Sequence, residues 1–198
     1  MTGMEKARPI LYYDLGSPYA YLAAERAAGI LSVKPRLQPI LVGGIFVERG
    51  HGSWAHTPER DARIAEIEGR AARYGLPPVV WPGGWPNNTL KAMRAAIWAD
   101  SLGAGESFAL AAFRRAFRHG ADLSSVEEIE SVARSVGLEA AGLTEAIGAQ
   151  PTKDALREAT AQAWARGVVG VPCIDVGGEV FFGDDRLEDA AGHWSSAG

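Results

Sequence analysis

Ser17 and Pro18 are the residues whose types and spacing best suit a chemical role, because they stand where the hydrophobic period changes. The preceding residues 10–13, Ile-Leu-Tyr-Tyr, are short and apolar, as in a buried strand, whereas residues 18–31 are alanine-rich and helical in pattern. Proline suits the first position of a helix, so Ser17 is predicted to be the N-cap. The hydroxyl of Ser17 either only caps the helix or also faces an anion at the positive end of the helix dipole. The local sequence does not choose between these two interpretations.

The other residues of chemical interest are one cysteine and two histidines. Cys173 follows Pro172 in an apolar run and is either a nucleophile or a small buried apolar residue. Since Cys173 is the one cysteine, an internal disulfide is excluded and a cytoplasmic location is the simplest expectation. His51 and His56 share a loop without a third potential ligand, so we predict no metal site and interpret both as solvated loop residues.

The composition argues against several classes of protein. A length of 198 residues suffices for one well-buried domain, or for one domain with a large insertion. The net charge of −4 carries mixed signs and argues against a nucleic-acid partner, which a basic face would favour. No apolar run approaches the roughly 20 residues of a membrane span. Residues 1–9 have no apolar segment of the kind found in a signal peptide.

The two ends of the chain carry the pattern of strands. Strands are predicted at 10–14, 35–41, 171–176 and 179–182. The Gly177-Gly178 pair between the last two predicts a hairpin. Helices are predicted at 18–31 and at 187–194, so the order is β-α-β, then several helices, then β-β-α.

The middle of the chain is predicted to be helical. Helices are expected from Thr57 with Pro58, after Asn88, around Leu110–Phe117, from a capping box at Ser125–Glu128, near 139–148 and at 152–166. Residues 43–56 look too glycine-rich for an element of their own. No linker is apparent, so we interpret residues 1–198 as one domain. Its core is expected at 10–50 and 167–198, and residues 57–166 form an all-helical insertion.

Four motifs support a family assignment. They are YYDLGSPYAYL at 12–22, PILVGGIF at 39–46, NTLKAMRAA at 88–96 and GVVGVPCIDVGGEVFFGDDRL at 167–187. In these motifs the chain resembles kappa-class glutathione transferases and 2-hydroxychromene-2-carboxylate isomerases, which are relatives of the DsbA oxidoreductases. The resemblance implies an α/β, thioredoxin-like fold interrupted by a large all-helical insertion. Thiol–disulfide exchange is not expected, because residues 17–20, Ser-Pro-Tyr-Ala, stand where the redox enzymes carry a cysteine pair.

The resemblance also implies a glutathione site. Ser17 would donate a hydrogen bond to the glutathione sulfur and favour the thiolate. Val171-Pro172 would hold a cis peptide bond and leave the Val171 backbone free to pair with glutathione, although a proline here can also simply start a strand. Asp184 and Asp185 fall where the family binds the γ-glutamyl ammonium group. Two acids at a helix start also match the helix dipole without any ligand.

Tyr19, His51 and Arg60 complete the glutathione contacts that the resemblance implies. Gly50-His51 stands where the family usually has Gly-Asn, and Arg60 stands where a lysine is common. The guanidinium of Arg60 would grip the glycyl carboxylate through two hydrogen bonds. The imidazole of His51 would donate one hydrogen bond and does not replace both groups of an amide.

An aromatic substrate needs an apolar wall beside the thiol. Ile45, Phe46, Trp81 and Trp85 are the predicted lining of that pocket. The alternative for the two tryptophans, which lie among prolines, is that they only pack the insertion onto the sheet.

These expectations predict a glutathione-dependent isomerase of the 2-hydroxychromene-2-carboxylate type that acts in the breakdown of aromatic compounds. In such a reaction a thiolate adds reversibly to a conjugated substrate. The alternatives are a kappa-class-like glutathione transferase, which keeps the conjugate, and a non-catalytic thioredoxin-fold module that binds peptides in the cis-proline groove. The expected partners are glutathione and a small aromatic substrate, with neither nucleic acid nor membrane. The family also implies a homodimer.

Overall fold

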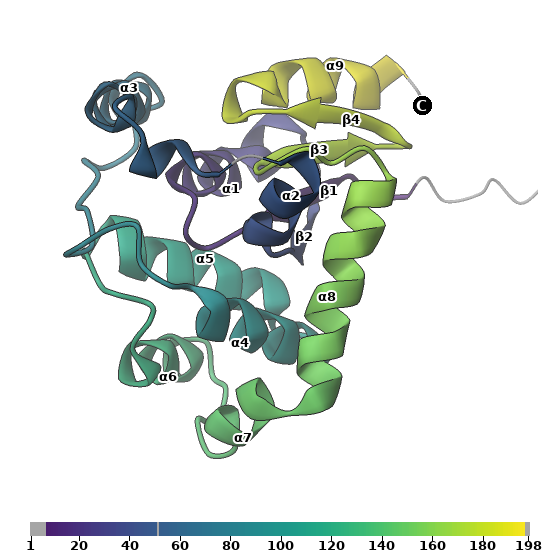
Figure 1. The fold of residues 1–198 in the computed structure, drawn as a ribbon. Helices are drawn as coiled ribbons and strands as arrows, with labels where there is room; N and C mark the ends of the chain where they lie inside the picture. Colours follow the sequence, from purple (N-terminus) through teal and green to yellow (C-terminus); the bar gives the residue numbers. More distant parts are fainter. Residues whose placement is uncertain (1–6, 51, 197–198) are drawn as a thin grey trace, which may run out of the picture.

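The computed structural model describes residues 7–50 and 52–196, whose elements follow the predicted order (Figure 1). The strands are Ile10–Tyr13 (β1), Arg36–Pro39 (β2), Cys173–Val176 (β3) and Glu179–Phe182 (β4). The helices are Pro18–Ile30 (α1), Val42–Arg49 (α2), Arg60–Arg73 (α3), Leu90–Ser101 (α4), Gly105–Phe117 (α5), Val126–Ser135 (α6), Leu143–Gly148 (α7), Gln150–Ala165 (α8) and Leu187–Ser196 (α9). Short 3-10 helices occupy Trp54–His56 and Asp184–Arg186.

The strands form one four-stranded mixed sheet in the order β2-β1-β3-β4. Strand β2 runs parallel to β1, with Leu37 opposite Leu11, because α1 carries the chain back to the same end of the sheet. Strand β3 is antiparallel to β1, with Ile174 opposite Leu11, and β4 is antiparallel to β3. The predicted α/β class and the β3–β4 hairpin are therefore confirmed.

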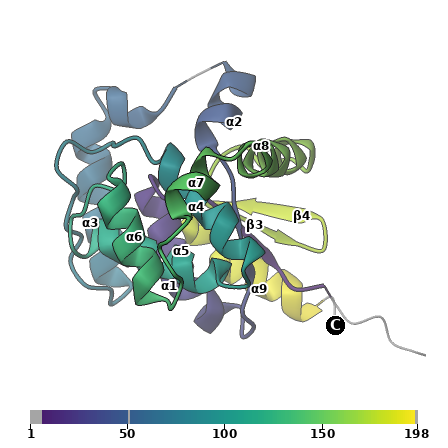
Figure 2. The ribbon, with the colours of Figure 1, turned by 90° about the horizontal axis from the view of Figure 1, so that it is seen from below.

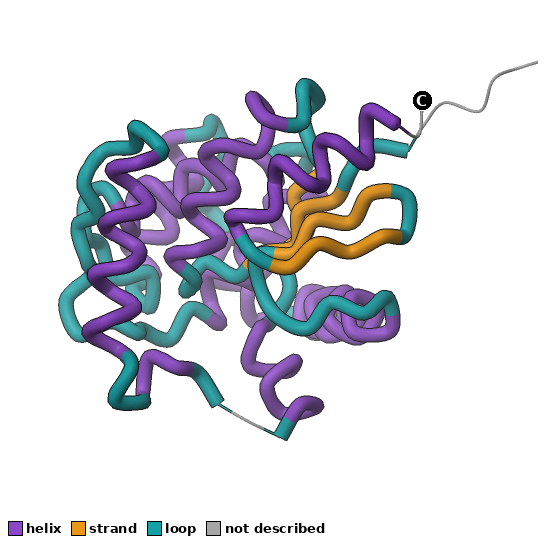
Figure 3. The backbone as a smooth tube through the Cα atoms, turned by 90° about the horizontal axis from the view of Figure 1, so that it is seen from above, coloured by secondary structure: helices purple, strands orange, loops and turns teal. Residues whose placement is uncertain are grey.

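Helices cover both faces of the sheet (Figures 2 and 3). Alternate residues of a strand point to opposite faces, and β1 accordingly supplies two cores. Leu11 and Tyr13 pack with α1 and α9, whereas Tyr12 packs with Ala163 of α8 and Ile45 of α2. Figure 2 shows α2 and α8 on one side of the strands and α9 on the other.

Helices α3 to α8 fall within the predicted helical insertion at 57–166, and α4 to α7 lie below the sheet in Figure 1. Their amphipathic patterns place Phe108, Phe113 and Phe117 of α5 in the larger core, together with α1. Helix α6 begins at its predicted cap, since the Ser125 hydroxyl accepts a hydrogen bond from the Glu128 amide. Within the described residues, no helix is long and apolar enough to cross a bilayer.

Two predictions about residues 43–59 are wrong. Val42–Arg49 forms α2 rather than a loop, because tertiary contacts fix it: Ile45 is buried, and the Val42 amide donates to the Asp14 carboxylate at 3.0 Å. Helix α3 begins at Arg60 rather than at Thr57 and Pro58. The Thr57 hydroxyl accepts a hydrogen bond from the Glu59 amide, so these residues form a turn ahead of the helix.

Candidate functional site

Ser17 is the N-cap of α1, and Pro18 is its first residue, as predicted. The Ser17 hydroxyl oxygen accepts a hydrogen bond from the Ala20 amide at 3.2 Å, and the Ser17 amide donates to the Asp14 carbonyl at 3.0 Å. Capping uses the hydroxyl only as an acceptor. Among the described residues, no protein group accepts the proton of this hydroxyl, so a ligand can receive it.

Asp14 holds the Ser17 turn in place. The residue is 3% exposed, and its carboxylate accepts hydrogen bonds from the Gly16 amide at 2.9 Å, the Val42 amide at 3.0 Å and the Thr89 hydroxyl at 3.0 Å. Burial raises the pKa of Asp14, while these three hydrogen bonds oppose the shift. One side chain thus ties the start of α1 to the starts of α2 and α4. Asp14 was not among the predicted site residues, although an acid directly after a buried strand was the available signal.

An aromatic cluster lies beside the same turn. The Trp85 ring contacts the rings of Trp54 and Trp81, with centroids 5.4 and 4.9 Å away, and Trp54 meets Tyr19 edge to face at 5.9 Å. The Trp85 indole donates to the Gly16 carbonyl at 3.2 Å. Since Trp85 is only 6% exposed, the alternative in which it packs the insertion onto the domain fits the geometry better than an open pocket wall.

Arg60 and Tyr19 border this aromatic cluster. The Arg60 guanidinium donates to the Trp85 carbonyl at 3.2 Å and is 41% exposed, so it combines a fixed position with access to a ligand. The Tyr19 hydroxyl donates to Glu66 at 3.0 Å, so its proton already has an acceptor within the protein. The predicted contact His51 lies outside the described residues.

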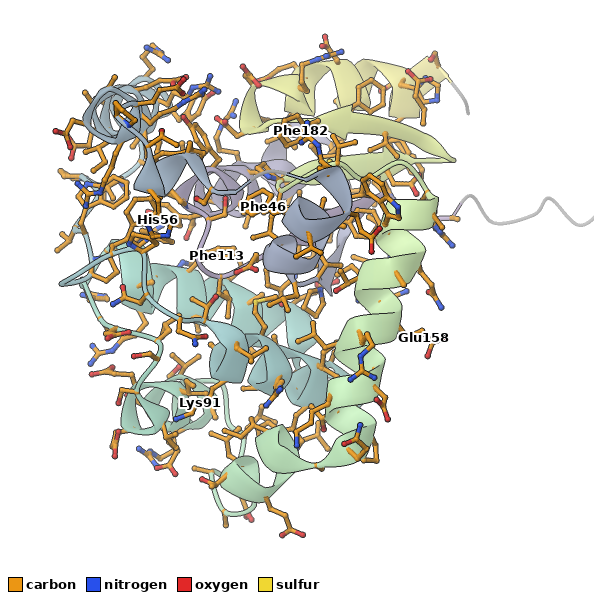
Figure 4. All side chains as sticks on the ribbon, viewed as in Figure 1. Phe46, His56, Lys91, Phe113, Glu158 and Phe182 are labelled. Atoms are coloured by element: carbon orange, nitrogen blue, oxygen red, sulfur yellow. The ribbon has the colours of Figure 1, made fainter. Side chains whose placement is uncertain are left out.

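The Val171-Pro172 bond is cis, as predicted. The pairing of β3 with its neighbours begins at Cys173, so Val171 lies outside the strand. Among the described residues, the Val171 backbone forms no hydrogen bond with the backbone of a turn or loop. The Pro172 carbonyl accepts from the Gly183 amide at 3.0 Å, which joins this segment to the turn after β4. Phe182 of that strand, labelled in Figure 4, has its ring against Gly170.

Asp184 was predicted to contact a ligand, but its side chain is buried. Its side chain is 1% exposed, and its oxygens accept from Arg70 at 2.8 Å and from the Tyr74 hydroxyl at 2.9 Å. Burial raises the pKa of Asp184, and both partners lower it. The Asp184 carbonyl also accepts from Arg26 of α1 at 3.0 Å. Asp184 therefore joins α3 and α1 to the turn before α9 and does not present its carboxylate to a ligand.

Asp185 is the accessible member of the acidic pair. Its side chain is 54% exposed and lies 3.2 Å from the Arg70 guanidinium. Gly183 has φ of 117°, and a Cβ there would lie 2.5 Å from an oxygen of Asp185, so only glycine fits this turn. The Arg70 guanidinium also lies 5.5 Å from the centre of the Tyr19 ring, which connects Asp185 with the residues beside Ser17.

The four predicted pocket residues do not form one wall. Ile45 is fully buried and lines a cavity between α2, α4 and α8, whereas Trp81 and Trp85 belong to the aromatic cluster beside Gly16. Phe46 is half-buried on α2 and is labelled in Figure 4. The prediction of a single lining is therefore wrong, because α2 turns Ile45 towards α8.

The surroundings of His56 and Cys173 bear on whether the first is a metal ligand and the second a nucleophile. His56 is exposed in the short helix at 54–56 (Figure 4). Across residues 7–50 and 52–196, no group of three or more potential metal ligands is found. Cys173 is 0% exposed, and burial raises the pKa of its thiol to about 12, so the thiolate is not populated near neutral pH.

Comparison with known proteins gives consistent results. The family model of the DSBA-like thioredoxin domain matches residues 10–194. A 2-hydroxychromene-2-carboxylate isomerase from Sphingobium xenophagum is 29% identical over 186 residues, which cover 89% of this chain and 92% of that protein. The solved structure of a 2-hydroxychromene-2-carboxylate isomerase matches with a TM-score of 0.84 at 21% identity, over 96% of each chain.

A redox relative shares the same fold at lower similarity. The cytosolic disulfide reductase DsbM from Pseudomonas aeruginosa, solved with GSH, has a TM-score of 0.62 at 16% identity, over 96% of this chain and 98% of that one. The predicted thioredoxin-like fold with a helical insertion is therefore confirmed.

Proposed function

This chain belongs to the family of DSBA-like thioredoxin domains, and on that premise we propose that it is a glutathione-dependent isomerase of the 2-hydroxychromene-2-carboxylate type, acting in aromatic-compound catabolism. The observation that carries the proposal is the Ser17 hydroxyl, which caps α1 as an acceptor and keeps its proton for a ligand. Thiol–disulfide exchange needs thiols at this turn, and the one cysteine of the chain lies buried in β3.

The start of α1 suits a thiolate for two reasons. The free amides of a first helical turn and the helix dipole stabilise a negative charge. A hydroxyl that donates to the same atom adds a hydrogen bond to a charged group, which is stronger than a neutral one. Both effects lower the pKa of a thiol bound at Ser17.

The rest of glutathione also finds suitable groups. The Val171 backbone lies outside the strand ladder, which suits pairing with the cysteinyl unit as an added strand. Asp185 suits the γ-glutamyl ammonium, because its carboxylate is exposed. Arg60 suits the glycyl carboxylate, because its guanidinium is held by the Trp85 carbonyl and remains 41% exposed.

Bound glutathione would supply a thiolate nucleophile for reversible addition to the conjugated substrate. The Ser17 hydroxyl would donate a hydrogen bond to the glutathione sulfur and so favour the thiolate over the thiol. Asp14 fixes the turn that carries Ser17, through the Gly16 amide. The neighbouring aromatic cluster of Tyr19, Trp54 and Trp85 is joined to that turn by the hydrogen bond from the Trp85 indole to the Gly16 carbonyl.

An assay of the purified protein tests the proposal. We expect conversion of 2-hydroxychromene-2-carboxylate to its open-chain isomer, with glutathione required and recovered unchanged. Accumulation of a glutathione conjugate would identify a transferase instead. If glutathione binds but the substrate is converted neither with nor without it, the result would contradict catalysis and favour a binding module.

We predict that Cys173 is chemically inert. Replacing Cys173 with serine is expected to leave the turnover number within a few fold, because its thiol is buried and its pKa is raised to about 12. The assay is steady-state turnover, with circular dichroism to verify folding. A folded variant that has lost all turnover would restore the nucleophile interpretation.

We also propose a homodimer, on the basis of the family alone, and a cytoplasmic location, on the basis of the single cysteine. Light scattering at micromolar concentration measures the mass, and a monomeric mass would refute the dimer.

A further inference from the structure

The turn that leads from β1 to Ser17 is held by side chains of the helical insertion. The pairing of β1 with its neighbours extends no further than Tyr13, and the Ser17 amide closes the turn by donating to the Asp14 carbonyl at 3.0 Å. Leu15 and Gly16 are the two central residues of this turn. Contacts that fix these residues therefore also fix the position of the Ser17 hydroxyl.

Met93 of α4 holds the first of the central residues. The Leu15 amide donates to the Met93 sulfur at 3.2 Å, and the two residues are 1% and 0% exposed. A thioether is a weak acceptor, but a buried amide without any acceptor would be more costly. A methionine in a core usually only fills space, so this hydrogen bond gives Met93 a second role.

Trp85 and Thr89 hold the other residues of the turn. The Trp85 indole donates to the Gly16 carbonyl at 3.2 Å, and the Thr89 hydroxyl donates to the Asp14 carboxylate at 3.0 Å. A Cβ on Gly16 would lie 3.3 Å from the Thr89 hydroxyl oxygen. The turn therefore rests directly against the start of α4, with little room to move towards it.

Trp85, Thr89 and Met93, which we call the clamp residues, belong to one short segment of the insertion. Met93 follows Thr89 by one helical turn, so these two side chains share a face of α4, which lies below the sheet in Figure 1. The hydrogen bonds of the clamp residues reach each of the three residues between β1 and Ser17.

We propose that the clamp residues are positioning residues for the Ser17 hydroxyl. The inference rests on the glutathione site proposed above, and it adds that the helical insertion keeps this hydroxyl at hydrogen-bond distance from the thiolate sulfur. Hydrogen bonds weaken steeply as distance and angle depart from their optimum, so a small shift of the turn reduces the stabilisation of the thiolate. The alternative is that the three contacts only attach the insertion to the sheet.

Two substitutions of Met93 test the proposal in the full chain with glutathione bound. Met93→Leu keeps an apolar side chain and removes the acceptor, so we expect the pKa of the glutathione thiol, read from thiolate absorbance, to rise and turnover to slow by about tenfold. Met93→Gln offers a carbonyl oxygen to the Leu15 amide but buries an amide group. It should therefore be the less stable variant and yet keep the thiol pKa nearer to that of the unmodified protein.

Two further variants make the test specific. Trp85→Phe keeps an aromatic ring and removes the hydrogen bond to Gly16. It is also expected to raise the thiol pKa, and it decides the question if the Met93 variants do not fold. Tyr74→Phe is the matched control, because it removes a hydroxyl that donates to the buried Asp184 carboxylate at 2.9 Å. This control is expected to lower the melting temperature and to leave the thiol pKa unchanged.

Two results would overturn the positioning role and leave the glutathione site standing. One is a lowered thiol pKa in the unmodified protein that persists in Met93→Leu and Trp85→Phe. The other is an equal rise of the thiol pKa in Tyr74→Phe, which would trace the effect to a general loss of stability. An unmodified protein that binds glutathione without lowering its thiol pKa would instead refute both the positioning role and the chemistry at Ser17.

Discussion

Replacing Ser17 with alanine is expected to raise the pKa of the thiol of bound glutathione and to slow the thiolate-dependent step by about ten- to 150-fold. The change removes a hydrogen bond to a charged sulfur, worth about 1.5–3 kcal/mol. Thiolate absorbance of bound glutathione against pH measures the shift directly. In the unmodified protein the pKa is expected to lie below that of free glutathione, and in the variant it moves back up.

A matched control is needed because the same substitution removes a helix cap. The Ser17 hydroxyl accepts from the Ala20 amide, so the variant loses about 1 kcal/mol of stability whatever else the hydroxyl does. Ser125 caps α6 in the same way, through the Glu128 amide, and lies in the helical insertion. Ser125→Ala should therefore lower the melting temperature to a similar extent and leave the thiol pKa unchanged.

The pKa measurement separates the two interpretations of Ser17, which a melting temperature does not. If glutathione binds with an unshifted thiol in both the unmodified protein and Ser17→Ala, Ser17 is a cap and nothing more. The proposed isomerase chemistry would then lose its central group.

Local patterns in the sequence predicted the parts of the site that depend on short-range structure. The strand–Ser17-Pro18–helix junction follows from a change of hydrophobic period and from the preference of proline for the first helical position. The hairpin of β3 and β4 follows from Gly177-Gly178, where both glycines have positive φ. These features need no knowledge of distant residues.

The parts that the sequence did not predict depend on distant partners. Helix α2 contains Gly43-Gly44, which disfavours a helix, but contacts from Asp14 and Thr160 fix its first turn. Asp184 and Asp185 are neighbours in the sequence and both contact Arg70, yet among the described residues only Asp184 also accepts a hydrogen bond from Tyr74 and is buried, at 1% exposed against 54%. Which of two adjacent acids is buried is decided by such tertiary contacts.

Replacing Arg70 with methionine is expected to lower the free energy of unfolding by about 3–5 kcal/mol, because it leaves a buried carboxylate without its cation. Arg70 lies 2.8 Å from Asp184, and the exposed fractions of the two side chains are 17% and 1%. Urea denaturation at neutral pH measures the loss. Arg134→Met breaks an exposed pair with Glu130 and is expected to change stability by well under about 1 kcal/mol.

The loss in Arg70→Met is expected to shrink as the pH falls. Burial raises the pKa of Asp184, and removing Arg70 removes a charge that opposes this shift. A carboxyl whose folded-state pKa exceeds its unfolded value of about 3.9 binds its proton more tightly in the folded state, so stability declines as the pH rises through the folded pKa. Acidification therefore protonates Asp184 and relieves the unpaired charge. Adding Asp184→Asn to Arg70→Met removes that charge at every pH, so the double variant should be more stable than Arg70→Met at neutral pH and should lose this pH dependence. A double variant as unstable as Arg70→Met at neutral pH would show that Arg70 stabilises the fold through Glu66 or packing rather than through Asp184.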